Sequence, residues 1–202
     1  MSARSATVPS DLAAPADKPA RERIFNVAMD LFYRQGIRAV GVEAIVAAAG
    51  ATKMSLYRNF PSKDALVEAY LKSRNETYWQ WWDEVVARHP GQPRQQIIAL
   101  FKSVAGRSTR PNYRGCPFTN AATEFPERGH PGRAVAAANK AQLRDRLRGL
   151  AAEAGAREPE RLGDQLFLLM EGAYASGQIM GPSGPALHLA EAADALIAAQ
   201  VG

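Results

Sequence analysis

Residues 24–60 carry the helical spacing of apolar side chains three times in succession, with a glycine after each of the first two stretches. The side chains that fall on one helix face in these stretches are Ile24, Val27, Ala28, Leu31, Phe32, Val42, Ile45, Val46, Ala49, Leu56 and Phe60. Gly36 and Gly50 are predicted to follow the first two helices, because glycine makes a sharp turn at little steric cost. Thr52 can cap the third helix through its hydroxyl, and Pro61 ends it. This pattern predicts three short helices packed around one small core.

The rest of the chain also has helical periodicity, interrupted by clusters of glycine and proline. Ser62 is suited to the N-cap of a fourth helix that extends to about Arg88. Further helices are predicted at residues 93–108, 117–125, 132–154, 159–179 and 185–201. No strand is predicted, so the expected fold is all-α, with about nine helices divided between a small N-terminal head and a larger bundle.

Composition limits the classes of protein to which the chain can belong. It is 47% hydrophobic and 22% charged, and no stretch approaches the roughly 18 apolar residues of a membrane span. Residues 1–18 are rich in alanine, serine and proline and lack the apolar core of a secretory signal, so we expect a disordered tail on a cytoplasmic protein. The net charge of +5 is compatible with a polyanionic partner.

The second and third predicted helices, with Gly50 between them, have the lengths and the turn of a helix-turn-helix motif. In that motif the N-terminal residues of the second helix face the base edges of the major groove. Side chains at this place in the sequence can bond to bases or phosphates and can meet a thymine methyl group. The predicted DNA-binding residues are Thr52, Lys53, Met54, Ser55, Tyr57, Arg58, Asn59 and Lys63. Residues 19–71 are therefore predicted to form a helix-turn-helix DNA-binding domain.

The segment TKMSLYRNFPSKDALVEAYL resembles the TetR family of bacterial regulators, as do the first two predicted helices. The hallmark residues, which recur at the spacing of that family, are Leu56, Tyr57, Phe60, Ser62 and Lys63. The resemblance implies that bases or nearby phosphates are contacted by Lys53, Met54, Ser55 and Asn59. It also implies that Tyr57 and Lys63 bind the phosphate backbone of DNA. Phe60 is expected to lie in the core because of its helical spacing.

The start of the second predicted helix departs from the family pattern. The family often has serine or threonine where this chain has Gly41 and Val42, so a side-chain cap and a phosphate contact are expected to be missing. Glu43 is expected to face DNA unfavourably if this end of the helix approaches a phosphate. Recognition is therefore expected to depend mainly on residues 52–59 and on Lys63.

The resemblance further implies that residues 72–202 form an effector-binding and dimerisation domain. The helix predicted from Pro159 is apolar nearly all round between Leu166 and Met170, and the last helix carries many alanines. We therefore expect these two helices to form a homodimer interface, and a two-fold dimer predicts a palindromic operator in double-stranded DNA. The residues predicted to contact a small apolar or amphipathic effector are Trp82, Phe101, Phe118, Asn120, Phe125, Phe167, Met170 and Tyr174.

The expected function is a homodimeric transcriptional regulator, and within this family a repressor is the commoner role. Two alternatives stay open: a helical protein-interaction module, and a redox sensor that uses the single cysteine, Cys116, without a small-molecule effector. A helical enzyme is disfavoured because no paired catalytic residues stand at a recognisable spacing. No metal is expected, because the histidines are widely scattered, and no cofactor is expected, because the sequence has no phosphate-cradling glycine loop.

Overall fold

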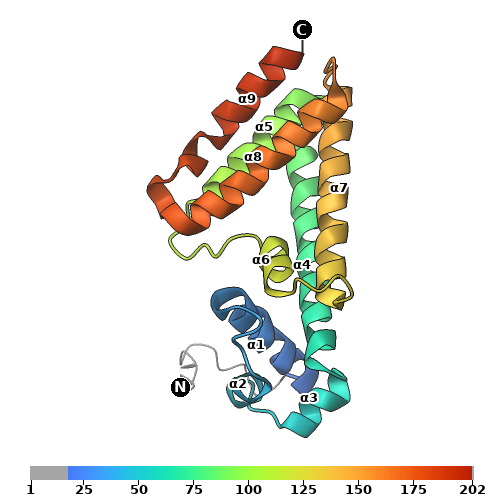
Figure 1. Ribbon diagram of the computed structural model, residues 1–202, viewed down its shortest axis with the longest axis vertical. Coiled ribbons are helices and arrows are strands. Elements are labelled where there is room, and N and C mark those ends of the chain that lie inside the picture. The colour runs from blue at the N-terminus through green and yellow to red at the C-terminus, as the bar shows by residue number, and fades with distance from the viewer. Residues whose placement is uncertain (1–17, 202) are drawn as a thin grey trace. The chain divides into compact units, whose positions relative to one another are not determined.

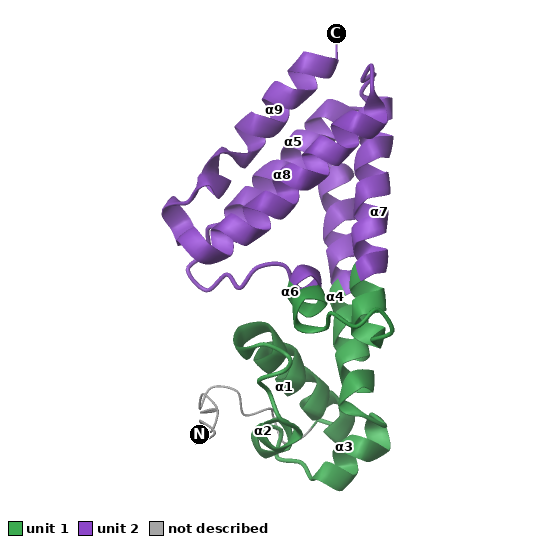
Figure 2. Cartoon of the chain, in the orientation of Figure 1, with its two compact units in different colours: residues 1–74, 120–136 green, residues 75–119, 137–202 purple. Residues whose placement is uncertain are grey.

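The computed structural model describes residues 18–201, and every regular element in that range is helical (Figure 1). The all-α prediction is thereby confirmed, while the predicted tail lies outside the described residues except for Lys18. The described chain divides into two compact units (Figure 2). Residues 18–74 and 120–136 belong to unit 1, and residues 75–119 and 137–201 belong to unit 2.

Unit 1 contains the three predicted short helices, α1 (Ala20–Gln35), α2 (Val42–Ala48) and α3 (Lys53–Asn59), and each packs against the other two. All of the apolar side chains in the predicted stripes are buried. The first glycine, Gly36, has a φ of 91°, and the second, Gly50, has a φ of 56°. Both lie in the left-handed region that favours glycine, so the predicted breaks between the helices have the expected backbone cause.

The helix α4 (Lys63–Val86) follows Pro61, and its first half belongs to unit 1. The Ser62 hydroxyl accepts the backbone N–H of Ala65 at 3.0 Å, as predicted for an N-cap. The ring of Tyr70 meets that of Phe32 edge-on with centroids 5.6 Å apart, which packs α4 against α1.

Residues 120–136 lie in unit 1 although they are distant in sequence from the rest of it. They include the end of α6 (Pro117–Glu124) and the start of α7 (Pro131–Glu153). At the start of α7, a Cβ atom on Gly132 would lie 3.0 Å from the Val67 side chain and 3.1 Å from that of Leu71. The helix therefore approaches α4 closely at this point. Unit 1 is therefore built from two separate stretches of the sequence.

In unit 2, α5 (Pro93–Ser108), α8 (Pro159–Met180) and α9 (Leu189–Gln200) pack on one another, while the remaining parts of α4 and α7 lie side by side (Figure 1). The helix predicted from Pro185 begins later than expected. Two 3-10 turns, η2 (Gly181–Ser183) and η3 (Pro185–His188), precede α9. The extended backbone of Gly184, with ψ 171°, separates these two turns.

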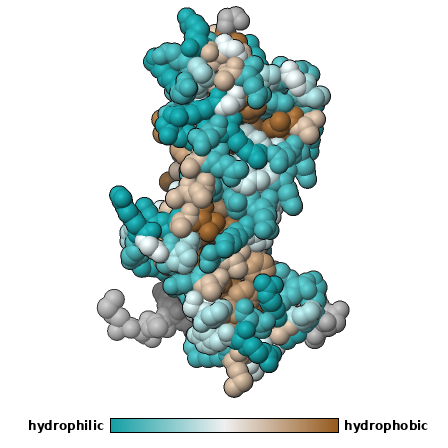
Figure 3. Space-filling view, turned by 90° about the vertical axis from the view of Figure 1, so that its right-hand side faces the viewer, coloured by the Kyte–Doolittle hydropathy of each residue, from teal (hydrophilic) through white to brown (hydrophobic). Residues whose placement is uncertain are grey.

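The face of the molecule in Figure 3 is mainly hydrophilic, and hydrophobic residues form small patches on it. Within residues 18–201, no helix combines the length and the apolar character that a membrane crossing requires.

Candidate nucleic-acid interface

The recognition helix predicted from the sequence is α3, and its first turn is capped as expected. The Thr52 hydroxyl accepts the backbone N–H of Ser55 at 3.1 Å. On the inner face of the helix Leu56 is fully buried, and Phe60, just after the helix, stacks on Phe25 with ring centroids 6.3 Å apart. The core position predicted for Phe60 is therefore confirmed, and α3 packs on the core of unit 1 through its inner face and its C-terminal end.

The outer face of α3 carries most of the residues predicted to bind DNA. Met54 is 81% exposed and Tyr57 is 47% exposed, so both large side chains are accessible on this face. Lys53 and Arg58 are also exposed, and Ser55 is half-buried. These side chains lie within six consecutive residues of one helix, so their polar groups and one apolar group can face a single groove of DNA.

Two predicted DNA contacts lie at the edge of this surface. The Asn59 side-chain amide donates to the backbone carbonyl of Ser55 at 2.8 Å. Lys63, the first residue of α4, is half-buried, and burial lowers the pKa of its ammonium group. The carboxylates of Glu124 and Asp64 oppose this shift. Their individual contacts with DNA remain predictions.

Arg23, on α1, binds the turn between α2 and α3 through hydrogen bonds to its backbone carbonyls. Its guanidinium donates to the backbone carbonyls of Ala49 and Gly50, each at 3.0 Å, and to that of Lys18 at 2.7 Å. The planar fork of donors on arginine suits such divergent acceptors. Because the first two carbonyls belong to the turn before α3, Arg23 on α1 fixes the position from which the recognition helix starts.

The start of α2 is unusual in the way that the sequence predicts. The N-cap residue Gly41 makes no side-chain cap hydrogen bond. Glu43, however, has a partner of opposite charge, because its carboxylate pairs with the Lys53 ammonium group at 2.5 Å. This pairing lowers the pKa of Glu43 and raises that of Lys53. The negative charge that was expected to disfavour DNA is thus neutralised by a residue of the recognition helix.

Glu124, the last residue of α6, binds the backbone of the loop that follows α1. Its carboxylate accepts the N–H of Ile37 at 3.0 Å and the N–H of Arg38 at 2.6 Å. Gly36 has no side chain, and a Cβ atom there would lie 3.5 Å from the Glu124 carboxylate. The adjacent Phe125 ring stacks on His130 with centroids 3.8 Å apart. Residues 120–136 therefore brace the loop between α1 and α2.

Glu124→Ala is expected to destabilise unit 1 by about 1–2 kcal/mol, because two backbone N–H groups lose a charged acceptor and the hydrogen bond to Ile37 is partly buried. Thermal unfolding measures this loss, and hydrogen exchange at the amides of Ile37 and Arg38 should accelerate. Glu127→Ala is the matched control, since the Glu127 side chain makes an exposed ion pair with Arg38 at 3.6 Å and the substitution keeps the backbone carbonyl. Equal unfolding temperatures for the two variants would contradict this role of Glu124.

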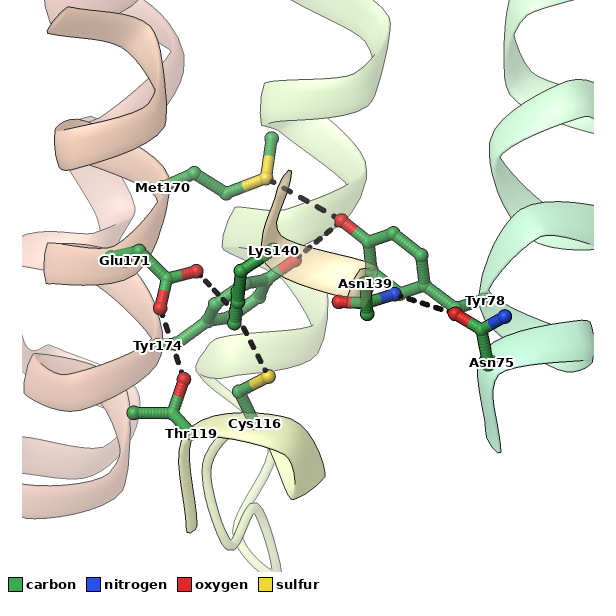
Figure 4. Close-up of polar contacts among 9 residues, drawn as sticks. All are labelled: Asn75, Tyr78, Cys116, Thr119, Asn139, Lys140, Met170, Glu171 and Tyr174. Atoms are coloured by element: carbon green, nitrogen blue, oxygen red, sulfur yellow. Dashed lines mark hydrogen bonds and ion pairs between the residues drawn. The ribbon is translucent and has the colours of Figure 1, made fainter. Parts of the chain in front are cut away.

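A second group of polar side chains, most of them buried or half-buried, lies in unit 2, where α4, α6, α7 and α8 approach one another (Figure 4). The hydroxyls of Tyr78 and Tyr174 face each other at 3.4 Å, and the Tyr78 hydroxyl donates to the Met170 sulfur at 3.8 Å. Burial raises the pKa of both phenols, so both remain protonated at neutral pH. Asn139, which is 2% exposed, donates to the Asn75 side chain at 2.9 Å.

The same group contains a charged pair. The Lys140 ammonium group lies 2.5 Å from the Glu171 carboxylate and 3.3 Å from the Cys116 sulfur. The other oxygen of Glu171 accepts the Thr119 hydroxyl at 3.0 Å. Polar groups in an apolar core are costly unless they are hydrogen-bonded, and most of these groups have such partners.

The structure does not bring all of the residues predicted to contact an effector together. Phe118, Met170 and Tyr174 surround Tyr78, with the Phe118 ring 6.1 Å from that of Tyr78. Trp82 and Phe101 are buried in unit 2, and Phe167 is half-buried there. Asn120 and Phe125 instead belong to unit 1. The sequence did not single out Tyr78, Lys140 or Glu171, because a polar residue within a helix gives no sign of its neighbours.

Models of two protein families match the chain. The model for bacterial regulatory proteins of the tetR family matches residues 24–70, and the model for the tetracyclin repressor-like C-terminal domain matches residues 93–193. The HTH-type transcriptional regulator YjdC of Escherichia coli is 24% identical over 152 residues, which are 75% of this chain and 80% of YjdC. The similarity therefore extends well beyond the helix-turn-helix.

Solved structures agree with this result. A TetR-family transcriptional regulator from Streptomyces coelicolor is 28% identical, covers 91% of this chain and 96% of its own, and superposes with a TM-score of 0.86. A Streptomyces avermitilis protein described as a TetR transcriptional regulator is 34% identical, with 88% of this chain and 99% of its own covered and a TM-score of 0.73.

Proposed function

Because the chain belongs to the TetR family and is a DNA-binding transcriptional regulator, we propose that it is a homodimeric repressor of a palindromic operator in the bacterial cytoplasm. A small apolar or amphipathic ligand releases it from that operator. The family and the relatives that the chain matches are regulators and not enzymes, so the chain is not a helical enzyme.

The observation that carries this proposal is the exposed outer face of α3. The capped start of α3 presents hydrogen-bond donors from Lys53 and Ser55 beside the apolar side chain of Met54, which is 81% exposed. The major groove displays acceptors and thymine methyl groups in matching combinations. DNA binding through this face accounts for the exposure of Met54 and Tyr57, which packing within unit 1 leaves unexplained.

A groove on α8 and α9 supports the homodimer. It has a volume of about 570 Å³, and its lining includes Leu168 and Leu169 from α8 and Leu196 from α9. Leu168 is 68% exposed although it lies in the apolar run of α8. A second copy of the same two helices related by a two-fold axis would cover these side chains in a four-helix arrangement.

Leu168→Glu is expected to convert the dimer to a monomer, because a carboxylate on the wall of this groove would have to lose its water without gaining a partner. Light scattering of the purified protein measures the mass, and circular dichroism checks the helical content. Ile179→Glu serves as the control, since Ile179 is 82% exposed and is not among the residues that line the groove. A dimeric Leu168→Glu protein would contradict the proposed interface.

The polar group around Tyr78 supports an effector site in unit 2. Aromatic walls with a few convergent polar groups are typical of small-molecule sites. A ligand that separates the Tyr78 and Tyr174 hydroxyls would favour another packing of these helices, and only a difference in affinity between two packings can move the protein off DNA. Operator binding measured with and without each candidate ligand tests this step. A ligand that binds tightly without changing operator affinity contradicts it.

A further inference from the structure

The first residue of the recognition helix is paired with the helix before it. Lys53 opens α3, and its ammonium group lies 2.5 Å from a carboxylate oxygen of Glu43, the second residue of α2. Both side chains are exposed, Lys53 by 56% and Glu43 by 71%. The pair therefore lies on the surface where α3 begins, and both of its members are accessible to DNA.

The pairing changes what Lys53 can recognise. A free lysine is a flexible point charge that any phosphate attracts, whereas a lysine held by a carboxylate has a restricted ammonium position. One of its three donors is used by Glu43, and two remain. The Glu43 carboxylate also accepts a hydrogen bond from the Glu43 backbone, and its remaining lone pairs can accept one more. Because the hydrogen bond from Lys53 keeps the pKa of Glu43 low, the carboxylate stays ionised at neutral pH.

These donors and the acceptor match one base pair in the major groove. Guanine presents two neighbouring acceptors, N7 and O6, and its partner cytosine presents the N4 donor. Adenine has a donor at N6 where guanine has O6, so it offers no such pair of acceptors. The two remaining ammonium protons of Lys53 suit guanine, and the remaining acceptor capacity of the Glu43 carboxylate suits cytosine.

We propose that Glu43 and Lys53 form one reading unit that recognises a G·C base pair in each half of the operator. Glu43 is then a specificity-determining residue and not only an unfavourable charge. The inference rests on the proposed DNA-binding function, since it assigns one base contact of the α3 surface.

Selection of binding sites from a random duplex pool, with wild-type protein and with Glu43→Ala, tests this proposal. The wild type is expected to select one G·C pair per half-site and to bind about tenfold more weakly when that pair is replaced by A·T. Glu43→Ala and Lys53→Ala should each lose this discrimination at the same base pair, and the double variant should lose no more than either single one. Thermal unfolding confirms that the variants are folded.

Glu68→Ala is the matched control, because Glu68 forms an exposed ion pair with Lys72 at 2.7 Å and its removal changes the net charge equally. It should raise affinity for all duplexes slightly and leave base preference unchanged. If Glu43→Ala behaves in the same way, the reading unit is refuted although DNA binding stands. If the wild type selects no sequence at all, the proposed function fails as well, so the two failures are distinguishable.

Discussion

Arg23→Ala is expected to weaken operator binding at least about tenfold and to destabilise unit 1 by about 2 kcal/mol. The variant loses three hydrogen bonds from a charged donor, two of which hold the carbonyls of Ala49 and Gly50 in the turn before α3. Without these hydrogen bonds the start of the recognition helix is no longer fixed relative to α1. DNA binding must then order this helix, and the entropic cost lowers the affinity. Fluorescence anisotropy with a labelled operator measures the affinity, and thermal unfolding measures the stability.

Two variants separate this positioning role from the loss of a positive charge. Arg34→Ala removes the same charge from the same helix, but Arg34 pairs with Asp30 within one turn of α1 and does not reach the α2–α3 turn through that pair. Its effect on operator binding should be small. Arg23→Lys keeps the charge without the planar fork and should restore only part of the affinity. An Arg23→Ala protein that binds as well as Arg34→Ala would contradict the role given to Arg23.

Gly163→Ala is expected to lower the stability of unit 2 by about 2 kcal/mol, which corresponds to a fall in Tm of roughly 4–8 °C for a chain of this size. A Cβ atom at Gly163 on α8 would lie 2.7 Å from the Cα of Arg148 on α7 and 2.8 Å from its backbone nitrogen. Backbone atoms cannot move aside as the end of a side chain can, so the two helices must separate.

Gly149→Ala is the matched control for this prediction. Gly149 also lies within a helix, α7, but a Cβ atom there would meet nothing within 4 Å. The substitution should raise stability by up to about 1 kcal/mol, because alanine has the higher helix propensity. The opposite signs of two glycine-to-alanine changes, followed by thermal unfolding, test the packing of α7 on α8. A stabilised Gly163→Ala protein would show that the close approach is absent.

Local features of the fold could be predicted from the sequence because their causes are local. The apolar stripe of α1, the breaks at Gly36 and Gly50, and the cap at Thr52 each depend on residues within a few positions of one another. The outer face of α3 could also be predicted, because the helical period places the exposed side chains opposite the buried Leu56. The late start of α9 was missed, because a proline at the first position fits a 3-10 turn as well as an α-helix.

Contacts between distant residues could not be predicted in this way. Glu124 lies 87 residues from Ile37 in the sequence, and Arg23 lies 27 residues from Gly50. Helix and strand periodicity relates residues a few positions apart, so it does not predict contacts at these separations. Glu43 was recognised as a charge near DNA, but its pairing with Lys53 depends on how α2 and α3 cross. These three residues carry most of what the structure adds to the DNA-binding surface.

Titration of duplex DNA with the purified protein at several salt concentrations tests the central claim most directly. The duplexes are the palindrome selected from a random pool and a shuffled sequence of the same composition. We expect the palindrome to bind at least about 10³-fold more tightly, with log K falling linearly with log salt by about 0.9 for each phosphate contact. Equal binding of the two duplexes, or an affinity that salt does not change, would contradict sequence-specific DNA binding by this protein.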